Sequence, residues 1–352
     1  MAQRFQTFQS YRYLLFLILV LGTLIPHAGY SWGARGHALV CESAIHLVKN
    51  ENLKHFLMTK MQGLSYLCNL PDTYWRGLPE ASIGGPTHFF ETDIVGMTFD
   101  EIPPNASFAD VEKMVKGKIN THQNRPLQEA SREMGSSWWR AEQFVRLATE
   151  AGKKGKKKVK LERDDDDLYT MWIMMGLLGH FVGDNAQPFH TTKNYDGWDT
   201  GNGGIHSYYE NELVNQLPAE ALVDVIRASS DAQKELPLAP TKGTVELMRA
   251  LAILSHKDIK ILLSKDPVTK PSKVYLPKGM EIKTEAQRKS PLLAMKAFQP
   301  HLVSHLSRGA SLLAQLWDKI YLDAGEPRLD KNQSYRFPHQ FPFVAPDYLS
   351  SK

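Results

Sequence analysis

Residues 171–190 read MWIMMGLLGHFVGDNAQPFH and decide the fold that we expect for this chain. The apolar residues that open the stretch predict a buried helix. His180 and Asp184 are four positions apart, so they lie on one face of that helix. Pro188 cannot continue the helix, and the turn there presents a second imidazole, His190, just beyond the helix end.

Two imidazoles and a carboxylate so close together indicate a metal site. A buried polar pair such as His180 and Asp184 loses its hydration and needs a strong partner to offset that loss. Imidazole and carboxylate groups are ligands that zinc uses in proteins. Taken alone, the stretch also allows a core His–Asp pair that is satisfied without a metal.

The first 31 residues have the layout of a secretory signal peptide. Arg4 and Arg12 precede an apolar run at residues 14–25, which is shorter than the ~20 residues of a membrane span. We therefore expect cleavage before Trp32 and a soluble protein that is secreted or periplasmic. Cleavage removes two basic and no acidic residues, so the formal charge falls from +4 to +2. That balance indicates no particular partner.

The rest of the chain predicts an all-α fold, a single mainly helical domain at residues 32–322 with a C-terminal tail at residues 323–352. No segment shows the clear two-residue alternation of a strand. Helices are expected within residues 38–48, 108–150, 241–264 and 291–322, and the aspartates at 164–167 are expected to cap the central helix. Cys41 and Cys68 would pair in an oxidising compartment, and two separately buried thiols are the alternative.

Further candidate ligands lie outside the central helix. Asp72 and His88 belong to a loop-rich section, where side chains can be aimed at a site that helices support. His206 and Glu210 repeat the four-residue spacing on a later helix. The complete set of candidate ligands is Trp32, His37, Asp72, His88, His180, Asp184, His190, His206 and Glu210. Five histidines and three carboxylates exceed what one tetrahedral zinc can use, so the set indicates more than one ion.

The order of these motifs resembles the family of trinuclear zinc-dependent phospholipases C and S1/P1-type nucleases. The residues that carry the resemblance are WGARGH at residues 32–37, Asp72, His88 in THFF, HFVGDNAQPFH at residues 180–190 and HSYYE at residues 206–210. The resemblance covers residues 32 to about 215. Beyond residue 215 the chain resembles the family only in its helical character.

The resemblance implies a mainly helical domain with three zinc ions in a cleft. It implies one zinc ion at Asp72, His88, His180 and Asp184, and a second at His190, His206 and Glu210. It implies a third at His37 and the α-amine and carbonyl of Trp32, with Asp184 as a bridge to the first. It also implies that Asp72 is the catalytic general base. A free α-amine, with a pKa near ~8, can lose its proton to a metal only after cleavage has exposed it.

The two branches of the family differ at the last ligand. Glu210 stands where the nucleases typically have aspartate, and His206 follows His190 by only 16 positions, as in the phospholipases. The motifs WGARGH and HFVGDNAQPFH, however, are closer to the corresponding nuclease sequences. The basic residue that nucleases carry three positions after the first aspartate is missing, because Trp75 stands there and Arg76 follows one place later.

These features favour a secreted zinc-dependent phospholipase C that hydrolyses phosphatidylcholine-like glycerophospholipids to diacylglycerol and a phosphorylated head group. Its partner would be a phospholipid membrane surface, and no obligate protein partner is implied. A nuclease acting on single-stranded DNA or RNA is the alternative, and an inactive zinc-stabilised binding protein is a weaker one. Tyr74, Trp75 and Phe89 are expected to offer aromatic faces to a choline group or a nucleobase. Arg35 stands where a choline pocket would need an acid.

Overall fold

The stretch at residues 171–190 forms the buried helix that its apolar residues predict. Helix α9 (Asp166–Ala186) is buried at every position from Met171 to Ala186. Asp165 caps its N-terminus, because its side chain accepts the backbone N–H groups of Asp167 and Leu168 at 3.0 Å each. As predicted, the helix ends before Pro188, which opens the 3-10 helix η5 (Pro188–Thr191).

The computed structural model describes residues 32–158, 165–239, 241–276, 281–330 and 336–349. The expected signal peptide therefore lies outside the described residues. The described part is a single mainly helical domain, which confirms the predicted fold class. None of its helices is both long enough and apolar enough to cross a membrane.

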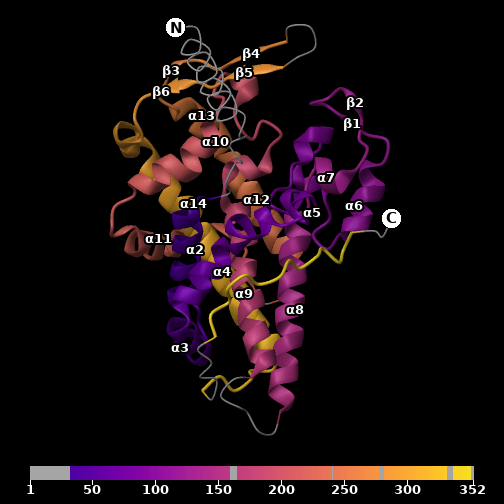
Figure 1. The fold of residues 1–352 in the computed structure, drawn as a ribbon, viewed down its shortest axis with the longest axis vertical. Helices are drawn as coiled ribbons and strands as arrows, with labels where there is room; N and C mark the ends of the chain where they lie inside the picture. Colours follow the sequence, from indigo (N-terminus) through magenta and orange to yellow (C-terminus); the bar gives the residue numbers. More distant parts are fainter. Residues whose placement is uncertain (1–31, 159–164, 240, 277–280, 331–335, 350–352) are drawn as a thin grey trace, which may run out of the picture. The chain divides into compact units, whose positions relative to one another are not determined.

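Several helices pack against α9 in the core. They include α2 (Ala34–Leu47), α4 (Met61–Thr73), α8 (Ser137–Lys157) and α14 (Pro291–Asp323). Figure 1 shows α8 running beside α9 over much of its length. Gly179 lets α2 and α4 approach closely, since a Cβ there would lie 2.3 Å from the Cys41 Sγ and 2.6 Å from the Cys68 Sγ. Glycine at this position is therefore a packing requirement.

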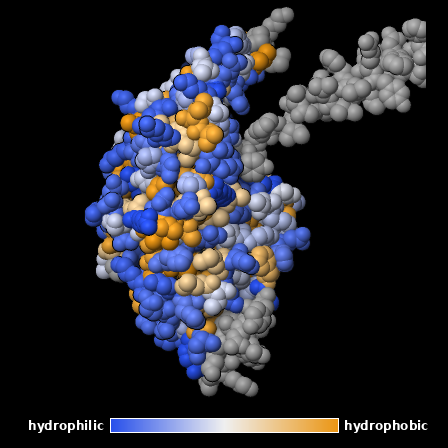
Figure 2. Space-filling model, turned by 90° about the vertical axis from the view of Figure 1, so that its left-hand side faces the viewer, coloured by the Kyte–Doolittle hydropathy of each residue, from blue (hydrophilic) through white to orange (hydrophobic). Residues whose placement is uncertain are grey.

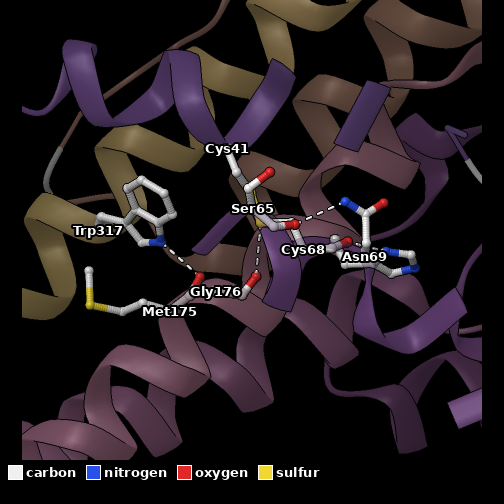
Figure 3. The surroundings of a disulfide bond; sticks show 8 residues. Cys41, Ser65, Cys68, Asn69, Met175, Gly176 and Trp317 are labelled. Carbon is white, nitrogen blue, oxygen red and sulfur yellow. Dashed lines mark hydrogen bonds between the residues drawn. A yellow bond between two sulfur atoms is a disulfide. The ribbon is translucent and has the colours of Figure 1, made fainter. Parts of the chain in front are cut away.

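Cys41 and Cys68 form a disulfide, which settles the alternative that their sequence context left open. Figure 3 shows the bond between α2 and α4, close to Gly176 of α9. Cys41 lies one helical turn after His37, and Cys68 lies one turn before Asp72. The disulfide thus joins two helices that each carry a candidate ligand, and it fits an oxidising extracellular compartment.

Removing this disulfide should lower the free energy of unfolding by about 2–4 kcal/mol, because the cross-link restricts the unfolded chain. Urea denaturation of the Cys41→Ala/Cys68→Ala variant beside the wild type would measure the effect. A reductant should lower the wild-type midpoint and leave that of the variant unchanged. Equal midpoints for oxidised wild type and variant would show that the bond contributes nothing to stability.

The remaining elements are shorter and lie around this core. The other α-helices are α3 (Glu51–Thr59), α5 (Ala81–Gly84), α6 (Phe108–Val115), α7 (Ala130–Glu133), α10 (Ile205–Ser207), α11 (Ala221–Glu235), α12 (Thr244–Lys257) and α13 (Ile259–Lys265). The 3-10 helices are η1 (Trp75–Gly77), η2 (Gly85–Thr87), η3 (Thr92–Val95), η4 (Phe99–Glu101), η6 (Trp198–Thr200) and η8 (Val214–Gln216), and η7 (Tyr208–Leu213) is a π-helix.

Strands occur only as three antiparallel two-stranded pairs among the described residues. β1 (Ile119–Asn120) pairs with β2 (Arg125–Pro126), β3 (Val268–Lys270) with β6 (Gln287–Arg288), and β4 (Lys273–Tyr275) with β5 (Ile282–Thr284).

Two expectations about local structure need correction. Asp72 lies in the last turn of α4 rather than in a loop, because Pro71 is accommodated inside the helix, two residues before its last residue Thr73. The helical pattern at residues 241–264 is divided at Asp258 into α12 and α13. Helix α11, which the sequence did not suggest, packs against α14.

The predicted C-terminal tail returns to the core and covers part of it, as Figure 1 shows for the yellow end of the chain. The Arg140 side chain donates a hydrogen bond to the Val344 carbonyl at 2.5 Å, and Gln143 donates to the Ala345 carbonyl at 2.7 Å. The Trp75 indole N–H donates to the Phe341 carbonyl at 2.9 Å. Residues 336–349 therefore belong to the packed structure of the domain.

Candidate metal centre

Three groups of histidine and acidic side chains bring their ligand atoms within 4.8 Å of one another. The groups are His37, His180 and Asp184; Asp72, His88 and His180; and His190, His206 and Glu210. Every predicted ligand except Trp32 belongs to at least one of them. All of these side chains are buried except His206, which is partly buried. Each group could hold a metal ion.

The first two groups are joined through α9. The Nε2 atom of His180 lies 2.9 Å from the Nδ1 atom of His88. The Oδ2 atom of Asp184 is 3.0 Å from that same Nδ1 and 3.3 Å from the His180 Nε2. The Oδ1 atom of Asp72 lies 3.7 Å from His88 and 3.8 Å from His180. Side chains from α4, α9 and the turn after η2 therefore converge on one point.

The third group is built by η5, α10 and the π-helix η7. The Nε2 atoms of His190 and His206 are 3.1 Å apart. The Oε2 atom of Glu210 lies 2.8 Å from the His206 Nε2 and 3.7 Å from the His190 Nε2. The Gln187 side-chain amide donates to this same oxygen at 3.1 Å, which orients the carboxylate.

Backbone carbonyls fix which nitrogen of three imidazoles carries the proton. The Nδ1 atom of His180 donates to the Cys68 carbonyl at 2.8 Å, that of His190 to the His88 carbonyl at 2.8 Å, and that of His206 to the Tyr195 carbonyl at 3.2 Å. Because a carbonyl can only accept, each neutral ring turns the lone pair of its Nε2 toward its group. The Nε2 atoms of His190 and His206 both face the third group, 3.1 Å apart, where one cation could bind both.

Two buried carboxylate oxygens also fit a bound cation. The Oδ1 atom of Asp184 and the Oε1 atom of Glu210 have no hydrogen-bond partner among the described residues. Leaving such an atom buried and unsatisfied is costly, and metal coordination would satisfy it. The Oδ1 atom of Asp184 points toward His37, whose Nε2 is 3.5 Å away, while its Oδ2 contacts His88. Asp184 therefore contacts ligands of both groups that include His180.

Burial sets the protonation of these side chains. It lowers the pKa of His37, His88 and His180 well below the usual value, so these rings are neutral and have a lone pair for a metal. Burial, and next the charge of Asp72, raises the pKa of Asp184. Burial alone would also raise the pKa of Glu210, but the adjacent His206 and His190 lower it overall. A bound cation would favour the ionised form of both carboxylates.

The start of α2 lies against the third group. Trp32 is completely buried and its ring is 5.6 Å from that of Tyr209. The Gly33 N–H donates to the Glu210 carbonyl at 3.1 Å. The His37 ring stacks on the His180 ring with their centroids 4.1 Å apart. The first residues of α2 are therefore packed between the groups on α9 and η7.

Gly183 of α9 is required for the position of His37. A Cβ at this residue would lie 2.8 Å from the His37 Nδ1, and that ring cannot move away freely because it is stacked on His180. Gly183→Ala should therefore lower the zinc bound per chain, measured by metal analysis, with little change in the far-ultraviolet circular dichroism. Without this contact, alanine would favour the helix by about 0.5–1 kcal/mol.

The matched control is Gly77→Ala, because a Cβ at Gly77 would meet nothing within 4 Å. This variant should keep the wild-type zinc content. If Gly183→Ala keeps it as well, the close approach of α9 to His37 is unimportant for metal binding.

Several residues singled out from the sequence have other roles. Trp75 is buried against Phe343 and Phe144, so it offers no face to a substrate. Arg35 donates to the backbone carbonyls of Val214, Asn215 and Pro218 and closes the end of the helical segment after Glu210. Tyr74 and Phe89 remain partly exposed.

Other contributors to the site carry no signal in the sequence. The carbonyls of Cys68, His88 and Tyr195 act through the backbone, which every residue possesses. Asp93 holds the loop after His190, accepting hydrogen bonds from the Thr192 hydroxyl at 2.7 Å and the Lys193 N–H at 2.9 Å. These contacts arise from the tertiary fold alone.

A comparison of the chain with protein-family models and with curated proteins found no match. The structure itself shows a mainly helical domain with three groups of His and Asp/Glu side chains that could hold metal ions.

Proposed function

We propose that the chain is a secreted zinc-dependent phospholipase C that hydrolyses the phosphodiester of phosphatidylcholine-like lipids. The observation that carries the proposal is the sharing of ligands between groups: His180 belongs to two of them, and Asp184 contacts ligands of both. Clustered ions suit phosphodiester hydrolysis. When bound, zinc ions polarise phosphoryl oxygens, lower the pKa of a bound water toward ~7 and neutralise the leaving oxygen.

The proposed ligand sets are those that the family resemblance implies. Asp72, His88, His180 and Asp184 would hold one ion; His190, His206 and Glu210 a second; and His37, Asp184 and the α-amine and carbonyl of Trp32 a third. All of these residues except Trp32 belong to the three groups. Imidazole and carboxylate donors, with rings oriented by carbonyls, fit zinc.

Asp72 is the proposed general base. The Arg76 Nε donates to the Asp72 Oδ1 at 2.8 Å and holds the carboxylate in place. Burial raises the pKa of Asp72, while the Arg76 charge opposes that shift. The carboxylate is therefore oriented to take a proton from an attacking water. The Arg76 side chain is 30% exposed, so its positive charge also faces an approaching phosphate.

A nuclease is the second candidate, and Tyr195 is the observation that favours it. Its ring is 51% exposed and lies edge-on to the ring of His206, with the centroids 5.9 Å apart. An exposed aromatic ring beside a metal ligand could stack on a nucleobase. Glu210 and its short separation from His190 favour the lipid substrate instead.

The test is a parallel assay of the purified zinc-loaded protein on phosphatidylcholine vesicles and on single-stranded DNA. We expect phosphocholine release from the lipid, DNA left intact, and loss of turnover in Asp72→Asn with zinc still bound at His190 and His206. Rapid DNA cleavage without lipid hydrolysis would establish the nuclease in place of the phospholipase. Turnover of neither substrate by the zinc-loaded protein would favour a binding protein.

A further inference from the structure

A small β-hairpin stands apart from the helical core. β4 and β5 pair antiparallel, from Lys273 with Thr284 to Tyr275 with Ile282. Every residue at 273–276 and 281–285 is exposed, and the Lys283 ammonium lies over the Trp198 ring, 5.3 Å from its centroid. Figure 2 shows a narrow projection at the top of the molecule, at the level of β4 and β5 in Figure 1. A lone two-stranded hairpin is marginally stable in water, so a partner would stabilise it.

The hairpin carries large apolar side chains in contact with water. Their exposed fractions are 43% for Val274, 50% for Tyr275, 71% for Leu276 and 46% for Ile282. Three of these four side chains are aliphatic. Apolar side chains exposed together on one hairpin are typical of an interaction surface.

Positive charge surrounds these apolar side chains. Among the described residues at 268–276 and 281–289, the exposed charged ones are Lys270, Lys273, Lys283 and Lys289, with Glu281 and Glu285. Lys283 pairs with Glu281 at 3.0 Å, and Asp266 is paired internally with Arg288 at 2.8 Å. The exposed charges therefore leave an excess of lysine, which suits an anionic surface.

The base of the hairpin is bound to the loop that supports the third metal group. The Ser272 N–H donates to the Gly201 carbonyl at 2.9 Å, and the Gly203 N–H donates to the Ser272 hydroxyl at 3.0 Å. The same loop begins with Tyr195 and Asp196, whose oxygens accept hydrogen bonds from the ring and the backbone of His206. A surface docked on the hairpin would thus lie beside the most exposed of the candidate ligands.

We propose that residues 273–276 and 281–285 dock the protein on an anionic lipid bilayer. The inference deepens the proposed phospholipase function and rests on it for its purpose. The aliphatic side chains would enter the acyl boundary while the lysines meet lipid phosphates. Single-stranded nucleic acid is the less suitable occupant, because it is bound by aromatic stacking, for which only Tyr275 is available here.

Vesicle flotation with mixed phosphatidylcholine–phosphatidylglycerol vesicles tests this docking in the protein that begins at Trp32. We expect the wild type to float with the vesicles, less so at high salt, and Leu276→Ser/Ile282→Ser to bind at least about tenfold more weakly. The matched control is Met58→Ser/Leu322→Ser, which removes two apolar side chains that are each 46% exposed. Met58 belongs to α3, which Figure 1 shows at the opposite end of the domain from β4 and β5. This control should bind vesicles as the wild type does.

Hydrolysis of a soluble short-chain phosphatidylcholine separates docking from catalysis. We expect the hairpin variant to keep the wild-type rate on that substrate and to lose rate only on vesicles. Wild type that fails to float, or a hairpin variant that floats equally well, would overturn the docking surface even if the soluble lipid is hydrolysed. Loss of single-stranded DNA binding in the hairpin variant, with no vesicle binding by the wild type, would assign the surface to nucleic acid. Flotation without hydrolysis of the soluble lipid would retain the docking surface and reject the phospholipase.

Discussion

Asp184→Asn should remove more zinc and more turnover than Glu210→Gln. Asp184 contacts ligands of two groups, with His88 at 3.0 Å and His37 at 3.5 Å, whereas Glu210 contacts only the pair His190 and His206. A neutral amide in place of a shared carboxylate also leaves two cations close together with less negative charge between them. We expect a loss of two ions per chain for Asp184→Asn and of one for Glu210→Gln.

Metal analysis and turnover numbers on the same preparations measure this difference. Because changing a residue that only orients a ligand typically costs ~10–100-fold in affinity or activity, loss of the shared ligand should cost more than ~100-fold in rate. Equal losses of zinc and of turnover in the two variants would contradict the bridging role of Asp184.

A chain that keeps one extra residue before Trp32 should lose the third zinc ion and most of its activity. An α-amine that has become a peptide N–H no longer has a lone pair to give a metal. Trp32 packs against Tyr209, and the Gly33 N–H donates to the Glu210 carbonyl, so this end of α2 lies beside the candidate ligands. Because both contacts are made by residues that the extended chain also has, that chain should still fold.

Proteins prepared with and without the extra residue should therefore differ in zinc content and rate but not in circular dichroism. The same residue added at the C-terminus serves as the control and should change nothing. Identical zinc content and rate in the extended and unextended forms would rule out the α-amine as a ligand.

The parts of the site that the sequence predicted correctly are those fixed by helical geometry. His180 and Asp184 share a face of α9 because four residues span about one turn, and the same rule relates His206 to Glu210 even though a π-helix begins between them. The end of α9 before Pro188 follows from the missing N–H of proline.

Features that depend on tertiary packing could not be predicted. Asp72 was expected in a loop-rich section, yet α4 continues to Thr73, and the end of this helix is packed in the core. The pairing of Cys41 with Cys68 depends on how closely α2 and α4 approach at Gly179, which composition does not reveal. The burial of Trp75 results from the return of the C-terminal tail across the core.

Diffraction from crystals of the zinc-loaded protein at the zinc absorption edge locates bound zinc ions directly. We expect three anomalous peaks. One should lie among Asp72, His88, His180 and Asp184, and a second among His190, His206 and Glu210. The third should lie beside His37 and the amino end of Trp32. Peaks confined to surface side chains, or no peak among these residues, would contradict the proposed trinuclear zinc site.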